Sequence, residues 1–373
     1  MTPVVTVAGA GPAGLMAADV LAQGGAKVTI IDHRAAPARK FLLAGRGGLN
    51  LTHSEPLDKF LTRYGAEQIF LEPIVRAFPP EAVIKWCEDL GIETFVGSSG
   101  RVFPEAMKAS PLLRAWLRRL EALGVELKSS TPWQGFGKGP EILAFGGASW
   151  PELGSDASWV ETFRAAGIKV NDFQPANCRI RVSWSDHFIS RHEGEPIKNL
   201  KLQYGRECVK GEVMISREGL EGGAVYALSR VMREEPGKPL LIDLKPALSG
   251  DAIAKRLAQP RGSLSQSNFL RRALGLTPAA IALLHESKNK IDHRGVKEVI
   301  LYPNGPVGLK RAISSAGGVD LGEVDEACQL VKMPLHYCVG EMLDWEAPTG
   351  GYLLQACFST AVAAARDLLK RLA

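Results

Sequence analysis

Residues 3–14 read PVVTVAGAGPAG, an apolar, β-branched run that ends in glycines spaced G-x-G-x-x-G. Apolar β-branched residues are typical of a buried parallel strand. The three glycines then have separate roles. Gly9 permits a tight turn, Gly11 lets a pyrophosphate approach the backbone, and Gly14 lets the following helix pack closely against the strand. The stretch predicts the first strand and turn of a dinucleotide-binding fold.

The residues that follow complete a βαβ unit. Residues 13–23 have the composition of a helix, and a second apolar run over 26–31 ends at Asp32. The N-terminus of that helix offers N–H groups and a partial positive charge to phosphates, and Asp32 can accept hydrogen bonds from a ribose. This unit by itself leaves NAD and FAD both open.

A second glycine-rich segment favours FAD. Residues 40–53 read KFLLAGRGGLNLTH, at a place where an NAD-dependent dehydrogenase would usually continue into a further βα unit. FAD is longer than one such unit can hold, so a second piece of backbone with small residues is needed along its ribityl and flavin ends. We expect Arg46 to neutralise phosphate charge, and Asn50 and His53 to offer polar contacts near the flavin ring.

Two later segments are expected to close over the same cofactor. Residues 335–339 are expected to form a strand that ends in Gly-Glu, followed by a loop, a glycine pair and a long alanine-rich helix whose N-terminus faces the flavin. Residues 142–156 are expected to form a buried strand that ends in a second glycine pair. The predicted cofactor-binding residues are Gly9, Gly11, Pro12, Ala13, Gly14, Asp32, His33, Lys40, Arg46, Gly47, Gly48, Asn50, Gly146, Gly147, Gly340, Glu341, Gly350, Gly351 and Tyr352.

These segments carry a family resemblance. Together with SSGRVFPEAMKASPLLRAWL at 98–117 and SSAGGVDLGEV at 314–324, they make nearly the whole chain resemble the BaiN/YhiN-like bacterial flavoproteins, as a shorter branch of them. The resemblance implies an α/β fold in which a two-dinucleotide-binding-type, Rossmann-like FAD domain is interrupted by an inserted β-rich barrel or sandwich and a small helical subdomain. It also implies NAD(P)H-linked redox chemistry, with activities in the wider family that include reducing carbon–carbon double bonds in steroids and in ribosomal RNA uridine.

The pattern of turns and β-rich runs sets the expected domain limits. The FAD-binding domain is expected at 1–170 and 311–373, the β-rich insert at 171–246, and short helices with a return strand at 247–310.

The proton that flavin chemistry requires has several candidate donors. They are His53, Glu218, Glu221 and Tyr226, each of which also has a plausible structural role. Longer members of the resembling family carry a histidine motif near 216–226, where this chain reads SREGLEGGAVY, so no catalytic residue is transferred. No metal site is expected.

Composition and charge bear on the cellular location and on the kind of partner. The six cysteines are scattered without a C-x-x-C pair, no apolar run is long enough to span a membrane, and no secretory leader is evident, so we expect a cytoplasmic protein with reduced thiols. Residues 171–310 hold 22 basic and 15 acidic residues, whereas the rest of the chain has a net charge of −2. This basic surplus is either an ordinary solvated surface or a surface for RNA. Oligomeric state stays open.

The sequence thus predicts an FAD-dependent oxidoreductase, with NAD(P)H as electron donor and an activated C=C bond of a small molecule as acceptor. Three alternatives remain: an RNA-modifying flavoprotein that reduces uridine in ribosomal RNA, a flavin monooxygenase, and a flavin-binding protein without turnover. The absence of an Asp-Gly dipeptide weakens the resemblance to aromatic hydroxylases.

Overall fold

The computed structural model describes residues 3–287 and 289–373, apart from the side chain of Arg46. The chain divides into two units. Unit 1 comprises Met1–Gln174 and Ser314–Ala373, and unit 2 comprises Pro175–Ile313. The chain therefore changes unit at 174/175 and 313/314, three or four residues beyond the limits expected from the sequence.

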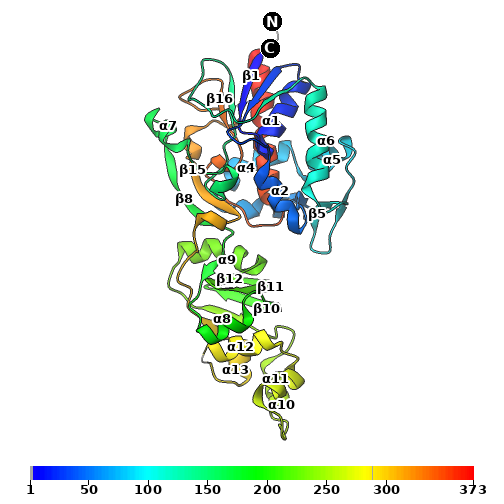
Figure 1. The fold of residues 1–373 in the computed structure, drawn as a ribbon, viewed down its shortest axis with the longest axis vertical. Coiled ribbons are helices and arrows are strands. Elements are labelled where there is room, and N and C mark those ends of the chain that lie inside the picture. Colours follow the sequence, from blue (N-terminus) through cyan, green and yellow to red (C-terminus); the bar gives the residue numbers. More distant parts are fainter. Residues whose placement is uncertain (1–2, 288) are drawn as a thin grey trace. The chain divides into compact units, whose positions relative to one another are not determined.

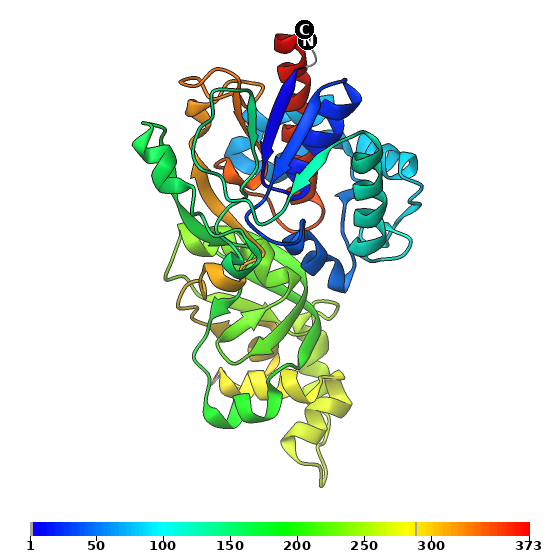
Figure 2. The same ribbon diagram turned by 45° about the horizontal axis from the view of Figure 1, so that its top comes forward.

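Unit 1 is built on a five-stranded parallel sheet with the strand order β16-β7-β1-β2-β6 (Figure 1). β1 (Val4–Ala8), α1 (Pro12–Gln23) and β2 (Lys27–Ile31) are the βαβ unit predicted from the sequence. The other strands are β6 (Glu126–Lys128), β7 (Glu141–Leu143) and β16 (His336–Cys338). β1 is central because the chain returns to both of its edges, and Figure 2 shows the parallel arrows of this sheet from a second side.

Helices and a small second sheet surround that core. α14 (Tyr352–Leu372) packs against α1, and the buried residues of both helices include several alanines. Three strands form an antiparallel sheet in the order β3-β5-β4. The remaining elements are α2 (Arg39–Ala44), β3 (Thr52–His53), α3 (Leu57–Leu61), α4 (Gln68–Ala77), α5 (Pro80–Asp89), β4 (Thr94–Val96), β5 (Arg101–Pro104), α6 (Ala109–Ala122), α7 (Val160–Ala165), β8 (Val170–Ala176) and β15 (Ser314–Val319). Short 3₁₀ turns lie at Gly45–Gly47, Thr62–Glu67, Pro151–Leu153, Leu321–Glu323 and Gly340–Met342.

A buried carboxylate ties α1 to its neighbours. The side chain of Asp19 is 1% exposed and lies 3.1 Å from Nε of Arg119 on α6. It also accepts hydrogen bonds from Nε1 of Trp86 on α5 and from Nε2 of Gln23. A buried charge is tolerated when it is paired and hydrogen-bonded in this way, so the contacts fix how the outer helices lie on α1.

Unit 2 contains a six-stranded antiparallel sheet in the order β14-β13-β10-β11-β12-β9. Its strands are β9 (Ile180–Arg181), β10 (Pro196–Tyr204), β11 (Glu207–Ser216), β12 (Gly219–Glu221), β13 (Leu240–Asp243) and β14 (Val299–Leu301). Its helices are α8 (Asp186–His192), α9 (Gly223–Glu234), α10 (Gly250–Leu257), α11 (Gln266–Leu274), α12 (Pro278–Glu286) and α13 (His293–Lys297), with a 3₁₀ turn at Leu309–Arg311. The helices of residues 247–310 share one hydrophobic core with the sheet.

These two units confirm the predicted α/β fold, with a parallel sheet in one unit and an inserted antiparallel sheet in the other. No helix among the described residues is long and apolar enough to cross a membrane.

The glycines of the first turn are required by close packing. Gly9 has φ +106°, and a Cβ there would lie 2.4 Å from the carbonyl oxygen of Ala144, which follows β7. A Cβ on Gly14 would lie 1.8 Å from the carbonyl oxygen of Gly9. Because both obstacles are backbone atoms, they cannot rotate away, and the start of α1 can approach the end of β1 only without these side chains.

We therefore expect Gly14→Ala to destabilise unit 1. The added methyl group must push α1 away from the turn, and overpacking of this kind costs about 1–3 kcal/mol or more of unfolding free energy. Thermal denaturation of the purified variant checks the expectation. A melting temperature equal to that of the parent would contradict it.

Candidate cofactor site

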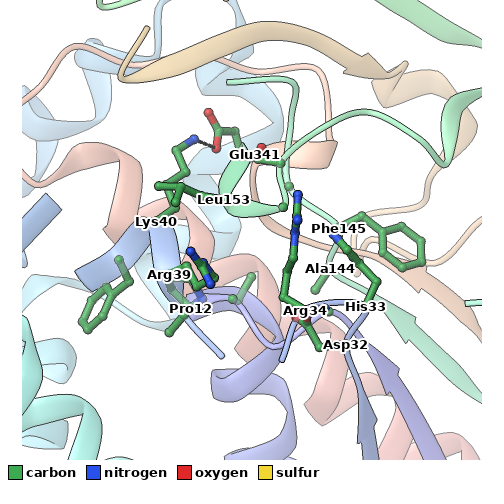
Figure 3. Close-up of a pocket in the computed structure, with 18 of the residues that line it drawn as sticks. Pro12, Asp32, His33, Arg34, Arg39, Lys40, Ala144, Phe145, Leu153 and Glu341 are labelled. Carbon is green, nitrogen blue, oxygen red and sulfur yellow. Dashed lines mark hydrogen bonds and ion pairs between the residues drawn. The ribbon is translucent and has the colours of Figure 1, made fainter. Parts of the chain in front are cut away.

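A pocket of unit 1 lies at the carboxyl ends of the parallel strands (Figure 3). Its lining includes the residues that directly follow β1, β2, β7 and β16, together with residues of α2 and of the stretch 153–159. Ligands of open parallel sheets bind at this edge, because the helix N-termini and the connecting loops meet there. Nine predicted residues line it: Gly9, Gly11, Pro12, Ala13, Asp32, His33, Lys40, Gly146 and Glu341.

The N-terminus of α1 faces this pocket without a side-chain cap. Gly11 is the N-cap residue, and the first turn of α1 contains no acidic residue. A Cβ built on Gly11 meets no atom within 4 Å, so the space in front of the turn is open. Free N–H groups beside open space suit a phosphate, which is the role predicted for this turn.

Asp32 fastens the end of β2 to the glycine turn. Its Oδ2 accepts a hydrogen bond from the backbone N–H of Ala10 at 2.7 Å, and its Oδ1 accepts one from the N–H of Arg34 at 2.7 Å. Each carboxylate oxygen has a second lone pair, so the ribose contact predicted for Asp32 remains available.

Lys40 and Glu341 form an ion pair across the pocket, although 301 positions separate them in sequence. Lys40 Nζ lies 2.7 Å from Glu341 Oε2 (Figure 3). It also donates a hydrogen bond to Ser149 Oγ. The other oxygen, Glu341 Oε1, accepts a hydrogen bond from the backbone N–H of Ser315 at 3.0 Å. The pair holds α2, the segment after β7 and the turn after β16 together around the pocket.

The turn at 151–156 contributes lining residues that the sequence reasoning missed. Arg34 Nη2 donates a hydrogen bond to the carbonyl oxygen of Pro151 at 2.7 Å, and His33 Nε2 lies 3.9 Å from Asp156 Oδ2. Ser155 is 6% exposed, and its Oγ has no hydrogen-bond partner among the described residues. An unpartnered buried hydroxyl in the lining of a pocket calls for a polar ligand, and FAD provides one.

The other lining residues were not predicted individually, although those within 142–156 and 335–339 belong to segments that were expected to close over the cofactor. They are Arg34, Ala36, Ala38, Arg39, Phe41, Ala144, Phe145, Leu153, Gly154, Ser155, Asp156, Ser158, Trp159, Val339 and Cys357. The small residues in GGASWPELGSD were a further hint, because small residues permit a close backbone approach to a ligand.

The remaining predicted contacts lie outside the lining of this pocket. They are Gly14, Gly47, Gly48, Asn50, Gly147, Gly340, Gly350, Gly351 and Tyr352, and the side chain of Arg46 lies outside what the structure describes. Some of these residues nevertheless lie close to the second glycine-rich segment. Gly351 has φ +100°, and a Cβ there would lie 2.4–2.5 Å from the backbone of Thr52 on β3, so the second glycine-rich segment meets the start of α14. Asn50 Oδ1 is buried and has no partner among the described residues.

His53 belongs to a network that anchors the start of α14. Its Nδ1 accepts a hydrogen bond from the N–H of Glu55, its Nε2 lies 3.0 Å from the carbonyl oxygen of Ser99, and its ring stacks on Tyr352. Glu55 in turn accepts hydrogen bonds from Arg63 and Tyr352. Burial opposes ionisation, but those hydrogen bonds lower the pKa of Glu55 to about 2. Both ring nitrogens of His53 are thus used locally.

The other three proton candidates come together in unit 2. Glu218, Glu221 and Tyr226 line a cavity of about 300 Å³. Arg179 donates to Glu221 Oε2 through Nε and Nη2, and to Glu218 Oε2 through Nη1 at 2.7 Å. Burial, together with the negative charge of Glu221, raises the pKa of Tyr226. No cluster of metal ligands occurs in the described parts of the chain.

The same substitution at Gly11 should have a different effect from that at Gly14. In the FAD-free protein, Gly11→Ala should change the unfolding free energy by about 1 kcal/mol or less, because the methyl group enters open space. The same methyl group should obstruct the pyrophosphate and weaken FAD binding at least about 10-fold, or about 1.4 kcal/mol. Fluorescence titration of the FAD-free variant measures the affinity. Unchanged affinity would show that the cofactor does not approach this turn.

Comparisons with known proteins agree with this geometry. The model of the HI0933-like protein Rossmann domain matches residues 3–141 and 138–367. The 3-dehydro-bile acid delta(4,6)-reductase of Clostridium scindens is 25% identical over 410 residues, which cover 98% of this chain and 99% of that protein. The ribosomal RNA dihydrouridine synthase of Escherichia coli is 24% identical over 398 residues, which cover 97% of each chain.

A solved structure shares the fold. The 3-ketosteroid delta1-dehydrogenase from Sterolibacterium denitrificans superposes with a TM-score of 0.54 at 11% identity, covering 99% of this chain and 100% of that one. At that identity the likeness concerns the fold alone. The family match, in contrast, extends over most of the chain, and it confirms the resemblance that the motifs predicted. The chain belongs to the HI0933-like protein Rossmann domain family and is an FAD-dependent oxidoreductase.

Proposed function

We propose that this protein is an NAD(P)H-linked reductase that saturates an activated C=C bond in a small molecule. The observation that carries the proposal is the pocket at the strand ends. Its open turn at Gly11 leaves space for the phosphates of a dinucleotide, and the hydroxyl of Ser155, unpartnered among the described residues, can hydrogen-bond to it. The alignment with a reductase of a 3-dehydro-bile acid over 98% of the chain supports a conjugated carbonyl compound as the acceptor.

The residues of unit 1 fit FAD. The turn at Gly11 and the start of α1 would receive the pyrophosphate, Asp32 would accept from a ribose, and Lys40 with Glu341 would lie along the chain of the cofactor. When bound, FAD supplies the hydride-transfer chemistry. The protein itself then has to orient the acceptor, exclude water and provide one proton.

Tyr226 suits the proton donor's role best among the four candidates. A tyrosine hydroxyl carries its proton at neutral pH, and burial and the neighbouring Glu221 raise the pKa of Tyr226 further. Glu218 and Glu221 are engaged with Arg179, and His53 uses both ring nitrogens in local contacts. We infer that Tyr226 gives its proton to the acceptor, at the carbon or oxygen where negative charge develops.

We further propose a cytoplasmic location. All six cysteines are free in the structure, and Cys87, Cys178, Cys328 and Cys338 are buried. A reducing compartment keeps such thiols free.

The purified protein should oxidise NADPH or NADH and pass the electrons to a conjugated enone without oxygen. The protein should be yellow, because FAD is retained. Its visible flavin absorbance should bleach when NAD(P)H is added anaerobically and recover when the acceptor follows. Recovery only with oxygen would point to a monooxygenase. No bleaching by either nucleotide would point to a flavin-binding protein without turnover.

Tyr226→Phe should slow the step that uses the acceptor by about 10²–10⁴-fold, since a general acid contributes that much. Bleaching by NAD(P)H should be unchanged, because this half of the cycle needs no proton from Tyr226. Stopped-flow measurement separates the two halves. Tyr302→Phe is the matched control. Because Tyr302 is 67% exposed, this substitution should change neither the reduction by NAD(P)H nor the step that uses the acceptor. Equal rates in parent and Tyr226→Phe would exclude this donor.

Ribosomal RNA is the second candidate acceptor. Unit 2 holds 23 basic and 14 acidic residues, whereas unit 1 holds 22 and 26. The match to a ribosomal RNA dihydrouridine synthase also favours this alternative. In the anaerobic assay, recovery of the absorbance by unmodified ribosomal RNA but by no enone would decide for RNA.

A further inference from the structure

A groove of about 470 Å³ runs between three helices of unit 2. α12 packs against both α8 and α11 (Figure 1). All three helices contribute residues to the lining. We call this the three-helix groove. It is separate from the cavity around Tyr226, because the two have no lining residue in common.

The groove gathers basic side chains from all three helices. His187 and Arg191 come from α8, Arg271 from α11 and His285 from α12. Within the part of the chain that the structure describes, these four side chains have no ion-pair or hydrogen-bond partner. Elsewhere in unit 2, arginines near carboxylates are paired, as Arg179 and Arg217 are. Among the described residues, the guanidinium groups of Arg191 and Arg271 therefore bring positive charge to one groove without an acidic partner, and an anion would supply that partner.

Among the described residues, the acidic residue of the lining, Glu286, forms no ion pair with these four side chains. Glu286 Oε1 accepts a hydrogen bond from the backbone N–H of Ser185 at 2.6 Å, and its Oε2 accepts one from Ser185 Oγ at 2.8 Å. Both carboxylate oxygens are therefore engaged with the start of α8. His192, also in the lining, lies 3.2 Å from Glu195 through Nδ1.

The lining also has an apolar part. Phe188 is 2% exposed and Ile281 is 5% exposed, and Pro278 and Ala282 lie in the same lining. Arginine binds phosphate oxygens through two parallel N–H donors, and a phosphate carries more charge than one carboxylate can. We propose that the three-helix groove binds a phosphate group, with the organic part of the same ligand against the accessible Pro278 and Ala282.

A phosphorylated metabolite and the backbone of RNA share this chemistry, and two probes separate them. Inorganic pyrophosphate is titrated into the FAD-loaded full-length protein by calorimetry, and a fluorescein-labelled 12-nucleotide oligouridine is titrated by anisotropy. We expect at least one probe to bind, and the double variant Arg191→Gln/Arg271→Gln to weaken binding at least about 10-fold, because two charge-assisted contacts are lost. Binding of pyrophosphate alone identifies a small ligand, whereas tighter oligonucleotide binding with a lower salt slope in the variant identifies RNA.

A matched control removes the same charge elsewhere in unit 2. Arg206→Gln/Lys210→Gln alters two exposed residues at the β10–β11 hairpin, which does not line the groove, and should weaken binding by about twofold or less. Arg191→Lys/Arg271→Lys keeps the charge and should retain part of the affinity. Failure of both probes to bind at low salt, or equal losses in the two Gln double variants, would overturn the proposal. FAD content and NAD(P)H-dependent bleaching should stay unchanged in each variant, so this outcome is independent of the proposed function.

Discussion

The approach of Gly14 to the carbonyl oxygen of Gly9 is the contact on which the site depends. It lets α1 begin directly at the end of β1, so the free N–H groups of its first turn face the space in front of Gly11. The backbone N–H of Ala10 in the same turn then holds Asp32, which fixes the end of β2. The close approach thus fixes the ends of β1 and β2 and the start of α1. Only glycine permits it, because any Cβ at position 14 would collide with the backbone.

Local sterics explain why this much could be predicted from sequence. The glycine spacing, the apolar runs and Asp32 lie within about thirty residues, and each has a physical role that only a few residue types fill. The sequence also suggested Lys40 and Glu341 as cofactor contacts. Their ion pair could not be foreseen, because it joins positions 301 residues apart and depends on how α2 and the turn after β16 meet. Ser155 was missed for a related reason: its value lies in being buried without a partner, which is a property of packing.

The choice among the candidate proton donors could likewise not be made from sequence. Sequence placed His53 near the flavin and grouped it with Glu218, Glu221 and Tyr226 on residue type alone. The surroundings separate them, since His53 is hydrogen-bonded at both nitrogens while Tyr226 lines a cavity beside a charged cluster. The charge of unit 2 was equally visible in the sequence as a total. Which arginines lack a carboxylate partner, and so retain an unneutralised charge, depends on helix packing and is visible only in three dimensions.

β8 and β15 pair with each other in a two-stranded sheet of their own. These strands adjoin the two places where the chain passes between units, at 174/175 and 313/314. The exit from unit 1 and the return to it are therefore neighbours, so a segment of almost any length can be exchanged between them without disturbing the parallel sheet. A change in the length or fold of unit 2 therefore leaves the parallel sheet, and the pocket at its strand ends, with the same chain path.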